Sequence, residues 1–256
     1  MTNREIIDRF LDYLLSERRY SALTVRNYRH DVEQFLAGRE PTTAEGDFEL
    51  LEVRSADVRE WIMHLADSQT MNSASINRTV ASLRSMYKYL RRKGIIERDI
   101  FAAVTAMRTA RRLPKFVAED DLRVVVERVR GDLRSEDWIT CRNALIVLML
   151  YACGLRLAEL VAVDVQHFDD GYSALRVRGK GDKERRVPIV EALRREIIVY
   201  VERFSAEKIC INPEKALFLS KRGGRISRSD VQRSVARLLR ECGVQGKVSP
   251  HVMRHT

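Results

Sequence analysis

The sequence has no long apolar run. No stretch reaches the ~18 consecutive apolar residues that a membrane-spanning helix needs, and the opening MTNREIIDRF lacks the apolar core of a signal peptide. We therefore expect neither a secretory signal nor a membrane span, and a cytoplasmic location.

Cysteine is scarce, and its spacing forms no motif. The four cysteines include no Cys-x-x-Cys pair, which argues against a disulfide framework and against a cysteine-rich zinc site. We expect packing thiols at Cys141, Cys153, Cys210 and Cys242. The sequence also has no Walker-type phosphate loop and no internal repeat, so neither a nucleotide cofactor nor a repeat architecture is indicated.

What the sequence does contain is an excess of positive charge. Its 256 residues include 46 Lys plus Arg against 36 Asp plus Glu, a formal net charge of +10, and most of the basic residues are arginines. With 45% hydrophobic and 32% charged residues, the chain can form one large or two ordinary globular domains. Guanidinium groups match phosphate oxygens in a two-pronged geometry, which favours a polyanionic partner. A generic basic surface is the alternative that net charge leaves open.

Residues 1–108 are predicted to form an all-helical N-terminal domain. Apolar residues recur at helical spacing in four segments, enough for a small bundle, with a polar loop at 41–46 between the second and third. We expect Ser55 to cap the third helix, Ser73 to open the fourth, and Gly94 to end it.

A basic linker and a mixed C-terminal domain follow. Residues 109–116 lack periodicity and contain Pro114, which is typical of a linker. In residues 117–256, helical patterns flank two alternating segments, ALRVRG (174–179) and ERRVPIV, which predict a β-hairpin around the turn KGDK. A further short strand is predicted at ALFLS (216–220). The expected fold class is mainly α with a small β-sheet.

Two motifs in the C-terminal part place a cation where a phosphate could lie. In GLRLAEL, Gly154 marks a turn, and Arg156 and Glu159 lie three residues apart on the next helix, so the carboxylate can brace the guanidinium. In GKGDKER, Lys180 stands at the mouth of the hairpin, where two glycines let the backbone approach a ligand closely. Each motif alone is also typical of a solvated basic surface.

The third motif is KVSPHVMRHT. Ser249 is a suitable N-cap and Pro250 a suitable first helical residue, so His251 and Arg254 fall at the positive end of a helix, a favourable place for an anion. A helix start with one core histidine is the plain alternative. His251 and His255 also have the spacing of a zinc helix, but no Glu adjoins His251 and no carboxylate cluster follows, so we expect no metal.

The three motifs in this order, behind a helical domain and a basic linker, resemble those of the tyrosine recombinases, or phage-type integrases, and most closely the Xer type. The resemblance implies a SAM-like core-binding domain over 1–108 and an α+β catalytic domain over 117–256. The two domains would clamp double-stranded DNA. It also implies a homo- or hetero-tetramer on paired sites, a possible regulatory protein and no cofactor.

The resemblance carries specific roles to residues of this sequence. Arg156 and Arg254 would grip the non-bridging oxygens of the scissile phosphate, with Glu159 in support and His251 as a further donor or acid/base. Lys180 would protonate the leaving 5′ oxygen. These roles agree with the chemistry, because two fixed guanidiniums stabilise the charge that builds on the equatorial oxygens in the transition state. Further DNA contacts are expected at Arg78, Arg84, Lys88, Arg111, Arg112, Lys183 and Arg185.

The tyrosine nucleophile of the family is missing from these 256 residues. The family pattern places it beyond the His251 and Arg254 motif, whereas all eight tyrosines precede that motif. We interpret the sequence as a fragment of a longer chain with an incomplete catalytic domain, and expect it to bind DNA without cleaving it. Two alternatives stay open: a non-catalytic, integrase-like DNA-binding protein, and an enzyme like a type IB topoisomerase.

Overall fold

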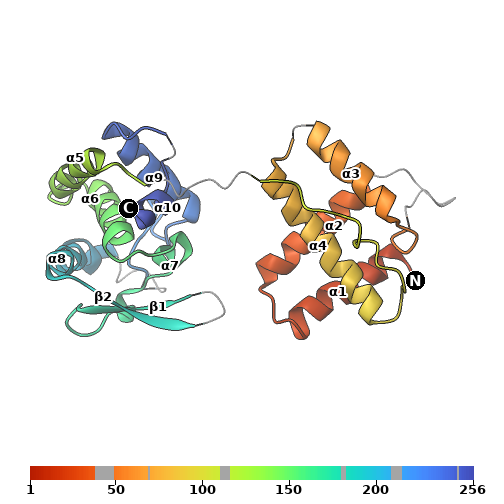
Figure 1. Cartoon of the computed structure of the whole chain (residues 1–256). Coiled ribbons are helices and arrows are strands. Elements are labelled where there is room, and N and C mark those ends of the chain that lie inside the picture. Colours follow the sequence, from red (N-terminus) through yellow and green to blue (C-terminus); the bar gives the residue numbers. More distant parts are fainter. Residues whose placement is uncertain (38–48, 69, 110–115, 180–182, 209–214, 247) are drawn as a thin grey trace. The chain divides into compact units, whose positions relative to one another are not determined.

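The computed structural model of the chain describes residues 1–37, 49–68, 70–109, 116–179, 183–208, 215–246 and 248–256, with the backbone alone at 204–208 and 255. The chain divides into two compact units, Met1–Arg111 and Arg112–Thr256 (Figure 1). The polar loop at 41–46 and most of the predicted linker at 109–116 lie outside the described residues.

The described part of the first unit is a bundle of four helices. They are α1 (Asn3–Ser16), α2 (Ala22–Ala37), α3 (Ser55–Asp67) and α4 (Ser73–Arg92). α4 packs against α2 and α3, and α1 packs against α2. Their apolar faces meet in one core, where Phe10, Phe35, Trp61 and Leu83 are almost completely buried. The predicted helical N-terminal domain is confirmed.

Polar side chains define where these helices begin. The Thr2 hydroxyl accepts from the Glu5 backbone N–H at 3.3 Å and the Glu5 carboxylate accepts from the Thr2 N–H at 2.9 Å, which forms a capping box for α1. Asn72 caps α4 by accepting from the Ser75 N–H at 2.9 Å. Gly94, with a φ of +68°, lies just past the end of α4, as predicted.

The prediction that Ser55 caps the third helix is wrong. The residue at the cap position is Arg54, whose backbone N–H donates to Asp57 Oδ2 at 2.7 Å, and Ser55 is the first helical residue. The Ser55 hydroxyl instead donates to the carbonyl of Ile100 at 2.6 Å. The hydroxyl therefore bonds a residue distant in the sequence and does not cap α3.

The chain after α4 runs back along that helix (Figure 1). Phe101 and Val104 are buried, and Arg84 of α4 donates to the Val104 carbonyl at 2.7 Å. The Asn77 side-chain amide bonds the backbone of Met107 in both directions, donating at 2.9 Å and accepting at 2.8 Å. These bonds hold Val104 and Met107 against the bundle. Without them, this segment would form part of the linker.

Asp31 of α2 is the one charged side chain among the fully buried described residues of this bundle. Its carboxylate accepts from Arg78 Nη1 at 2.6 Å, from Ser82 Oγ at 2.6 Å and from Thr79 Oγ1 at 3.4 Å, all on α4. Because buried polar atoms are costly unless they are bonded, this network fixes how α2 faces α4.

We expect Asp31→Ala to lower the free energy of unfolding of the first unit by about 2 kcal/mol, because it removes the charged acceptor of Arg78, Ser82 and Thr79. The two hydroxyls then keep only backbone carbonyls of α4, at 3.2 and 3.4 Å. Each unit contains one tryptophan, Trp61 and Trp138. Urea unfolding followed by Trp61 fluorescence in a Trp138→Phe background therefore reports on the first unit alone.

The matched control is Asp8→Ala. Asp8 also pairs with an arginine, Arg29, at 2.6 Å, but both side chains are nearly half exposed. An exposed ion pair contributes at most about 1 kcal/mol. Equal losses in the two variants would show that burial of Asp31 does not matter.

The described part of the second unit consists of helices around one central helix, with a hairpin beside them. Its elements are α5 (Glu119–Asp132), α6 (Trp138–Ala152), α7 (Leu157–Val161), the 3-10 turn η1 (Val165–His167), β1 (Ala174–Arg178), β2 (Glu184–Pro188), α8 (Glu191–Lys208), α9 (Arg228–Glu241) and α10 (Pro250–His255). The predicted mainly α class with a small β-sheet is confirmed. None of the helices in the described ranges is both long and apolar enough to cross a bilayer.

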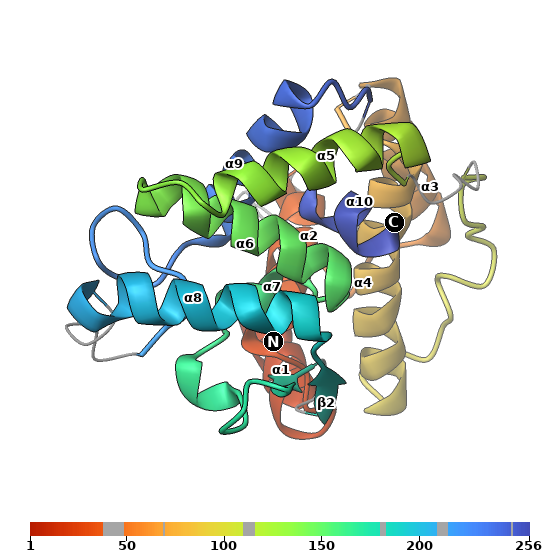
Figure 2. The ribbon, with the colours of Figure 1, turned by 90° about the vertical axis from the view of Figure 1, so that its left-hand side faces the viewer.

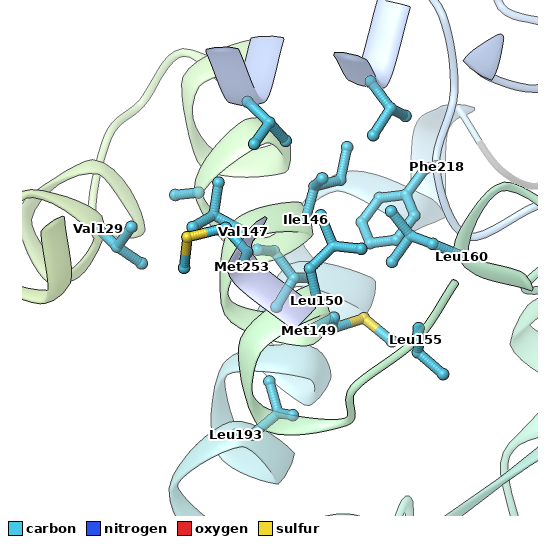
Figure 3. Close-up of a cluster of buried hydrophobic side chains, with 14 of the residues drawn as sticks. Val129, Ile146, Val147, Met149, Leu150, Leu155, Leu160, Leu193, Phe218 and Met253 are labelled. Atoms are coloured by element: carbon cyan, nitrogen blue, oxygen red, sulfur yellow. The ribbon is translucent and has the colours of Figure 1, made fainter. Parts of the chain in front are cut away.

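α6 is the core of this unit. Apart from Arg142 and Asn143, most of its buried side chains are apolar, as is typical of a buried helix, and it contacts α5, α7, α8, α9 and α10. Figure 2 shows α6 lying between α5 and α8. In Figure 3, Ile146 and Leu150 of α6 meet Leu160, Phe218 and Met253. This packing positions α7 and α10, the helices that carry two of the predicted motifs.

The predicted hairpin is confirmed. β1 and β2 are antiparallel, with a register that runs from Ala174 opposite Pro188 to Arg178 opposite Glu184. Leu175 and Val177 of β1 are buried, whereas β2 is exposed or half-buried along its length. The hairpin therefore attaches to the helices mainly through β1.

The predicted strand at 216–220 is wrong. The segment forms only isolated bridges, Asp164 with Ala216 and Leu219 with Arg225. Ala216 to Leu219 are all buried, so both faces of the segment pack into the core. Asp164 and Arg225 each pair with a single residue of the segment, so neither pairing forms a strand ladder.

Candidate functional site

Arg156 lies at the start of α7, in an extended conformation. The turn before it uses Gly154 at φ +56°, a region that disfavours other residues. The Arg156 N–H donates to Glu159 Oε2 and its Nη1 donates to Glu159 Oε1, both at 2.8 Å. The predicted bracing of Arg156 by Glu159 is therefore present, while half of the Arg156 side chain stays exposed.

Glu159 is buried, with 4% of its side chain exposed. Besides Arg156 it binds Arg185 of β2 in a two-pronged pair, Nη1 to Oε1 and Nη2 to Oε2, both at 2.8 Å. These bonds, first the one from Arg185 and then those from Arg156, lower the pKa of Glu159 to about 2. The carboxylate is therefore ionised at neutral pH.

Arg254 of α10 brings a third guanidinium to the same carboxylate. Val252 and Met253 are buried against the core, which fixes the direction of Arg254. Its Nη1 lies 3.9 Å from Glu159 Oε2, too far for a hydrogen bond. This Nη1 is buried and has no hydrogen-bond partner within the described residues.

We call Arg156, Glu159, Arg185 and Arg254 the Glu159 cluster. Three guanidiniums around one carboxylate leave a local charge of about +2. The half-exposed Arg156 and the unpartnered Nη1 of Arg254 can both still donate hydrogen bonds. Such an arrangement can bind an anion with two or more oxygens, of which a phosphate diester is one.

The base of the hairpin tip lies at this cluster. The Gly179 N–H donates to the Lys183 carbonyl at 2.8 Å, and a methyl group at Gly179 would lie 3.7 Å from Glu159 Oε1. Lys183 is exposed. Lys180, the predicted general acid, lies outside the described residues, as do Arg111 and Arg112 of the linker.

His251 is exposed on the first turn of α10. Pro250 is the first helical residue, as predicted, and Ser249 is at the cap position, although its hydroxyl makes no capping bond. The zinc alternative required the His255 side chain, which lies outside the described part. Among described residues, no group of three His, Cys, Asp or Glu side chains could hold a metal ion.

Two of the three predicted DNA contacts on α4, Arg78 and Arg84, have partners within their own unit. Arg78 pairs with the buried Asp31, and Arg84 lies over the Phe101 ring at 5.5 Å. Arg78, Arg84 and Lys88 are nevertheless exposed. Their contact with DNA stays a prediction.

Sequence reasoning missed two features of the second unit. It did not predict that the Arg185 guanidinium binds Glu159, and the DNA contact expected at Arg185 stays a prediction. It also missed a basic cavity of about 760 Å³ with Arg142 in its wall, beside Lys221 and Arg222. Arg142 is 4% exposed, and burial lowers its pKa. Both features depend on residues far apart in the chain, so no local signal could have revealed them.

Comparisons with known proteins agree with the resemblance. The model of the phage integrase family matches residues 117–256, and that of the phage integrase N-terminal SAM-like domain matches residues 7–94. The tyrosine recombinase XerC of Mesorhizobium japonicum is 32% identical over 259 residues, which cover 96% of this chain and 78% of that protein. The tyrosine recombinase XerD of Mycobacterium leprae is 28% identical over 257 residues, covering 96% and 80%.

The fold is also found in a solved structure. A crystal structure of a lambda integrase tetramer bound to a Holliday junction matches with a TM-score of 0.70 and 18% identity, covering 100% of this chain and 71% of that one. At this identity the match shows the fold alone. On the family models and the sequence relatives, the chain belongs to the phage integrase family of tyrosine recombinases, with Xer recombinases among its relatives.

Proposed function

We propose that this chain acts in site-specific DNA recombination and that the Glu159 cluster binds the scissile phosphate. The observation that carries the proposal is the convergence of Arg156 and Arg254 on one buried carboxylate, with Arg254 Nη1 left without a hydrogen-bond partner among the described residues. His251, on the same helix as Arg254, is a further donor or acid/base for the same phosphate.

The proposed reaction is a transesterification. A tyrosine hydroxyl gives its proton to a base, for which His251 is the proposed candidate, and its oxygen attacks the phosphorus. A 3′-phosphotyrosyl bond forms and the bond to the 5′ oxygen breaks. Lys180 gives that oxygen its proton. The 5′ hydroxyl of another strand then reverses the step. The guanidiniums stabilise the equatorial oxygens more strongly in the transition state than in the ground state.

None of the tyrosines in these 256 residues is the proposed nucleophile. The eight tyrosines are Tyr13, Tyr20, Tyr28, Tyr87, Tyr89, Tyr151, Tyr172 and Tyr200. Tyr87 and Tyr200 are buried, and burial raises their pKa, which disfavours the phenolate. Several others pack in the aromatic core of the first unit. We propose that these 256 residues bind and polarise the phosphate but do not cleave the strand.

The proposed partner is double-stranded DNA, contacted by both units. By analogy with the lambda integrase tetramer on a Holliday junction, four protomers would act on paired sites. The tetramer would contain one or two kinds of recombinase, and a regulatory protein is a further candidate partner. A non-catalytic, integrase-like DNA-binding protein is the second candidate function, which the positions of the tyrosines favour.

The test uses a pool of labelled, nicked duplexes. We expect affinity, measured by fluorescence anisotropy, to fall about a thousandfold between about 50 and 200 mM salt, because bound phosphates release counterions. The same samples, denatured in detergent, should contain no covalent adduct. The comparison protein is this chain extended by the tyrosine-bearing C-terminal segment of a Xer relative, which should form the adduct.

Each part of the proposal can fail separately. A flat salt response would contradict DNA binding by the basic surfaces. An adduct with the 256-residue chain would show that one of its own tyrosines is the nucleophile. Failure of the extended chain to form any adduct would favour the non-catalytic alternative.

A further inference from the structure

Glu159 has little remaining capacity to accept hydrogen bonds. Its two oxygens accept four: Oε1 from Arg156 Nη1 and Arg185 Nη1, and Oε2 from the Arg156 N–H and Arg185 Nη2, each at 2.8 Å. A carboxylate offers about four lone-pair positions. The acceptor positions of Glu159 are therefore filled by two residues, and half of those bonds come from Arg185.

Arg254 is the third cation near this carboxylate, and it is not bonded to it. Its Nη1 lies 3.9 Å from Oε2, about 1 Å beyond hydrogen-bond distance. It is buried, and the described residues supply no acceptor for it. The attraction to an ionised carboxylate acts on Arg254, but the positions that it would occupy are taken.

We propose, on the basis of the proposed function, that Arg185 is a positioning residue: by filling the acceptor positions of Glu159, it keeps Arg254 Nη1 available for the phosphate. Without Arg185, two acceptor positions on a buried carboxylate become empty. Arg254 Nη1 lies 3.9 Å from Oε2, and a shift of about 1 Å would bring it within hydrogen-bond distance. The donor would then point at Glu159 and not at a bound anion.

Removal of Arg185 also lowers the net charge of the Glu159 cluster. With Arg185 its local charge is about +2, and without it about +1, so the attraction for an anion also weakens. A lysine at this position would keep the charge but could not form the two parallel bonds, because an ammonium is a point donor. The two-pronged geometry of arginine is what the site requires.

The same pair ties the hairpin to α7. β2 is exposed or half-buried, and Arg185 is the residue through which it reaches the buried Glu159. Gly179, at the base of the tip, lies against this pair: a methyl group there would be 3.5 Å from Arg185 Nη1. Arg185 therefore acts on two parts of the proposed site at once.

The test follows the arginine side chains of this chain by ¹⁵N NMR during titration with inorganic phosphate. In the unmodified chain, phosphate should shift the Arg254 Nε signal. In Arg185→Gln we expect the phosphate affinity reported by Arg254 to fall about tenfold, the loss of one charge-assisted hydrogen bond. Rotation of the Arg254 guanidinium should also slow, because Nη1 is then bonded to Glu159.

The decisive variant is the double change Arg185→Gln with Glu159→Gln. A neutral amide at position 159 no longer attracts Arg254 strongly, so the phosphate response of Arg254 should return to within about threefold of the unmodified chain. A merely structural role for Arg185 predicts the opposite, because the double variant loses more bonds than the single one. Arg185→Lys should be intermediate.

The matched control is Arg186→Gln. Arg186 is the next residue on β2, points to the other face, and pairs with Asp169 with 70% of its side chain exposed. Arg186→Gln removes one positive charge, as Arg185→Gln does, but the phosphate affinity reported by Arg254 should be unchanged.

The outcomes separate this inference from the proposed function. If Arg254 of the unmodified chain does not respond to phosphate, the proposed phosphate grip is wrong, and the role of Arg185 falls with it. If the unmodified chain responds and Arg185→Gln responds equally, only the positioning role is wrong. Failure of the double variant to recover would also overturn it.

Discussion

Arg254→Ala is expected to lower the rate of strand cleavage about a thousandfold in a protein that carries the tyrosine nucleophile, while DNA affinity falls only a few-fold. Removing one fixed donor to a developing oxyanion typically costs about 10²–10³ in rate, and a guanidinium on a transferring phosphoryl group costs at least as much. DNA binding would depend on many phosphate contacts, of which the proposed contact of Arg254 is one. Arg156→Ala should behave in the same way.

The measurement is single-turnover cleavage of a nicked substrate, together with anisotropy binding on the same duplex. Arg195→Ala is the control, because Arg195 forms an exposed pair with Glu191 on α8, with 75% of its side chain exposed. Arg254→Lys keeps the charge and tests the geometry of the donor. An affinity loss as large as the rate loss would show that Arg254 contributes to ground-state binding and not to the transition state.

The second unit is expected to lose about 3 kcal/mol of stability as the pH falls from 4.5 to about 2, through Glu159. Bonds from Arg185 and then Arg156 lower the pKa of Glu159 from 4.5 to about 2. Between these values the unfolded chain binds the proton and the folded chain does not. The stabilisation is therefore complete above the unfolded pKa and is lost as the pH falls through the folded one. A difference of about 2.5 pKa units corresponds to about 3 kcal/mol.

Glu159→Gln should remove this dependence. The variant should be less stable at neutral pH, because Arg185 and Arg156 lose their counter-charge, and its unfolding free energy should change less with acid. Urea unfolding at several pH values, followed by Trp138 fluorescence in a Trp61→Phe background, measures the second unit.

Glu127→Gln is the control for the pH experiment. Glu127 forms an exposed pair with Arg130 on α5, with 72% of its side chain exposed, and such pairs contribute little. Equal flattening of the pH dependence in both variants would show that the buried position of Glu159 is not responsible.

The sequence by itself determined which segments form helices, where the hairpin lies and which family the chain resembles. Apolar spacing in α1 to α4 and the alternation of Leu175 and Val177 are local patterns, and a local pattern is enough to select a helix or a strand. The bracing of Arg156 by Glu159 was also predicted from their spacing, although Arg156 is the extended N-cap residue of α7 and Glu159 reaches back to it as in a capping box.

Only the tertiary structure decided what these side chains contact across the fold. Nothing in the strand of Arg185 indicates that its guanidinium binds Glu159 on α7. The Ser55 hydroxyl bonds the carbonyl of Ile100 and makes no capping bond. Residues 216–219 are buried on both faces, so their sequence shows no alternation that would predict it. The same physical reason applies to Arg185, Ser55 and residues 216–219. Donors, acceptors and apolar faces contact groups that lie near them in space. The spacing along a chain fixes the distance between two groups only within an element, and the packing of elements within each unit fixes it between them.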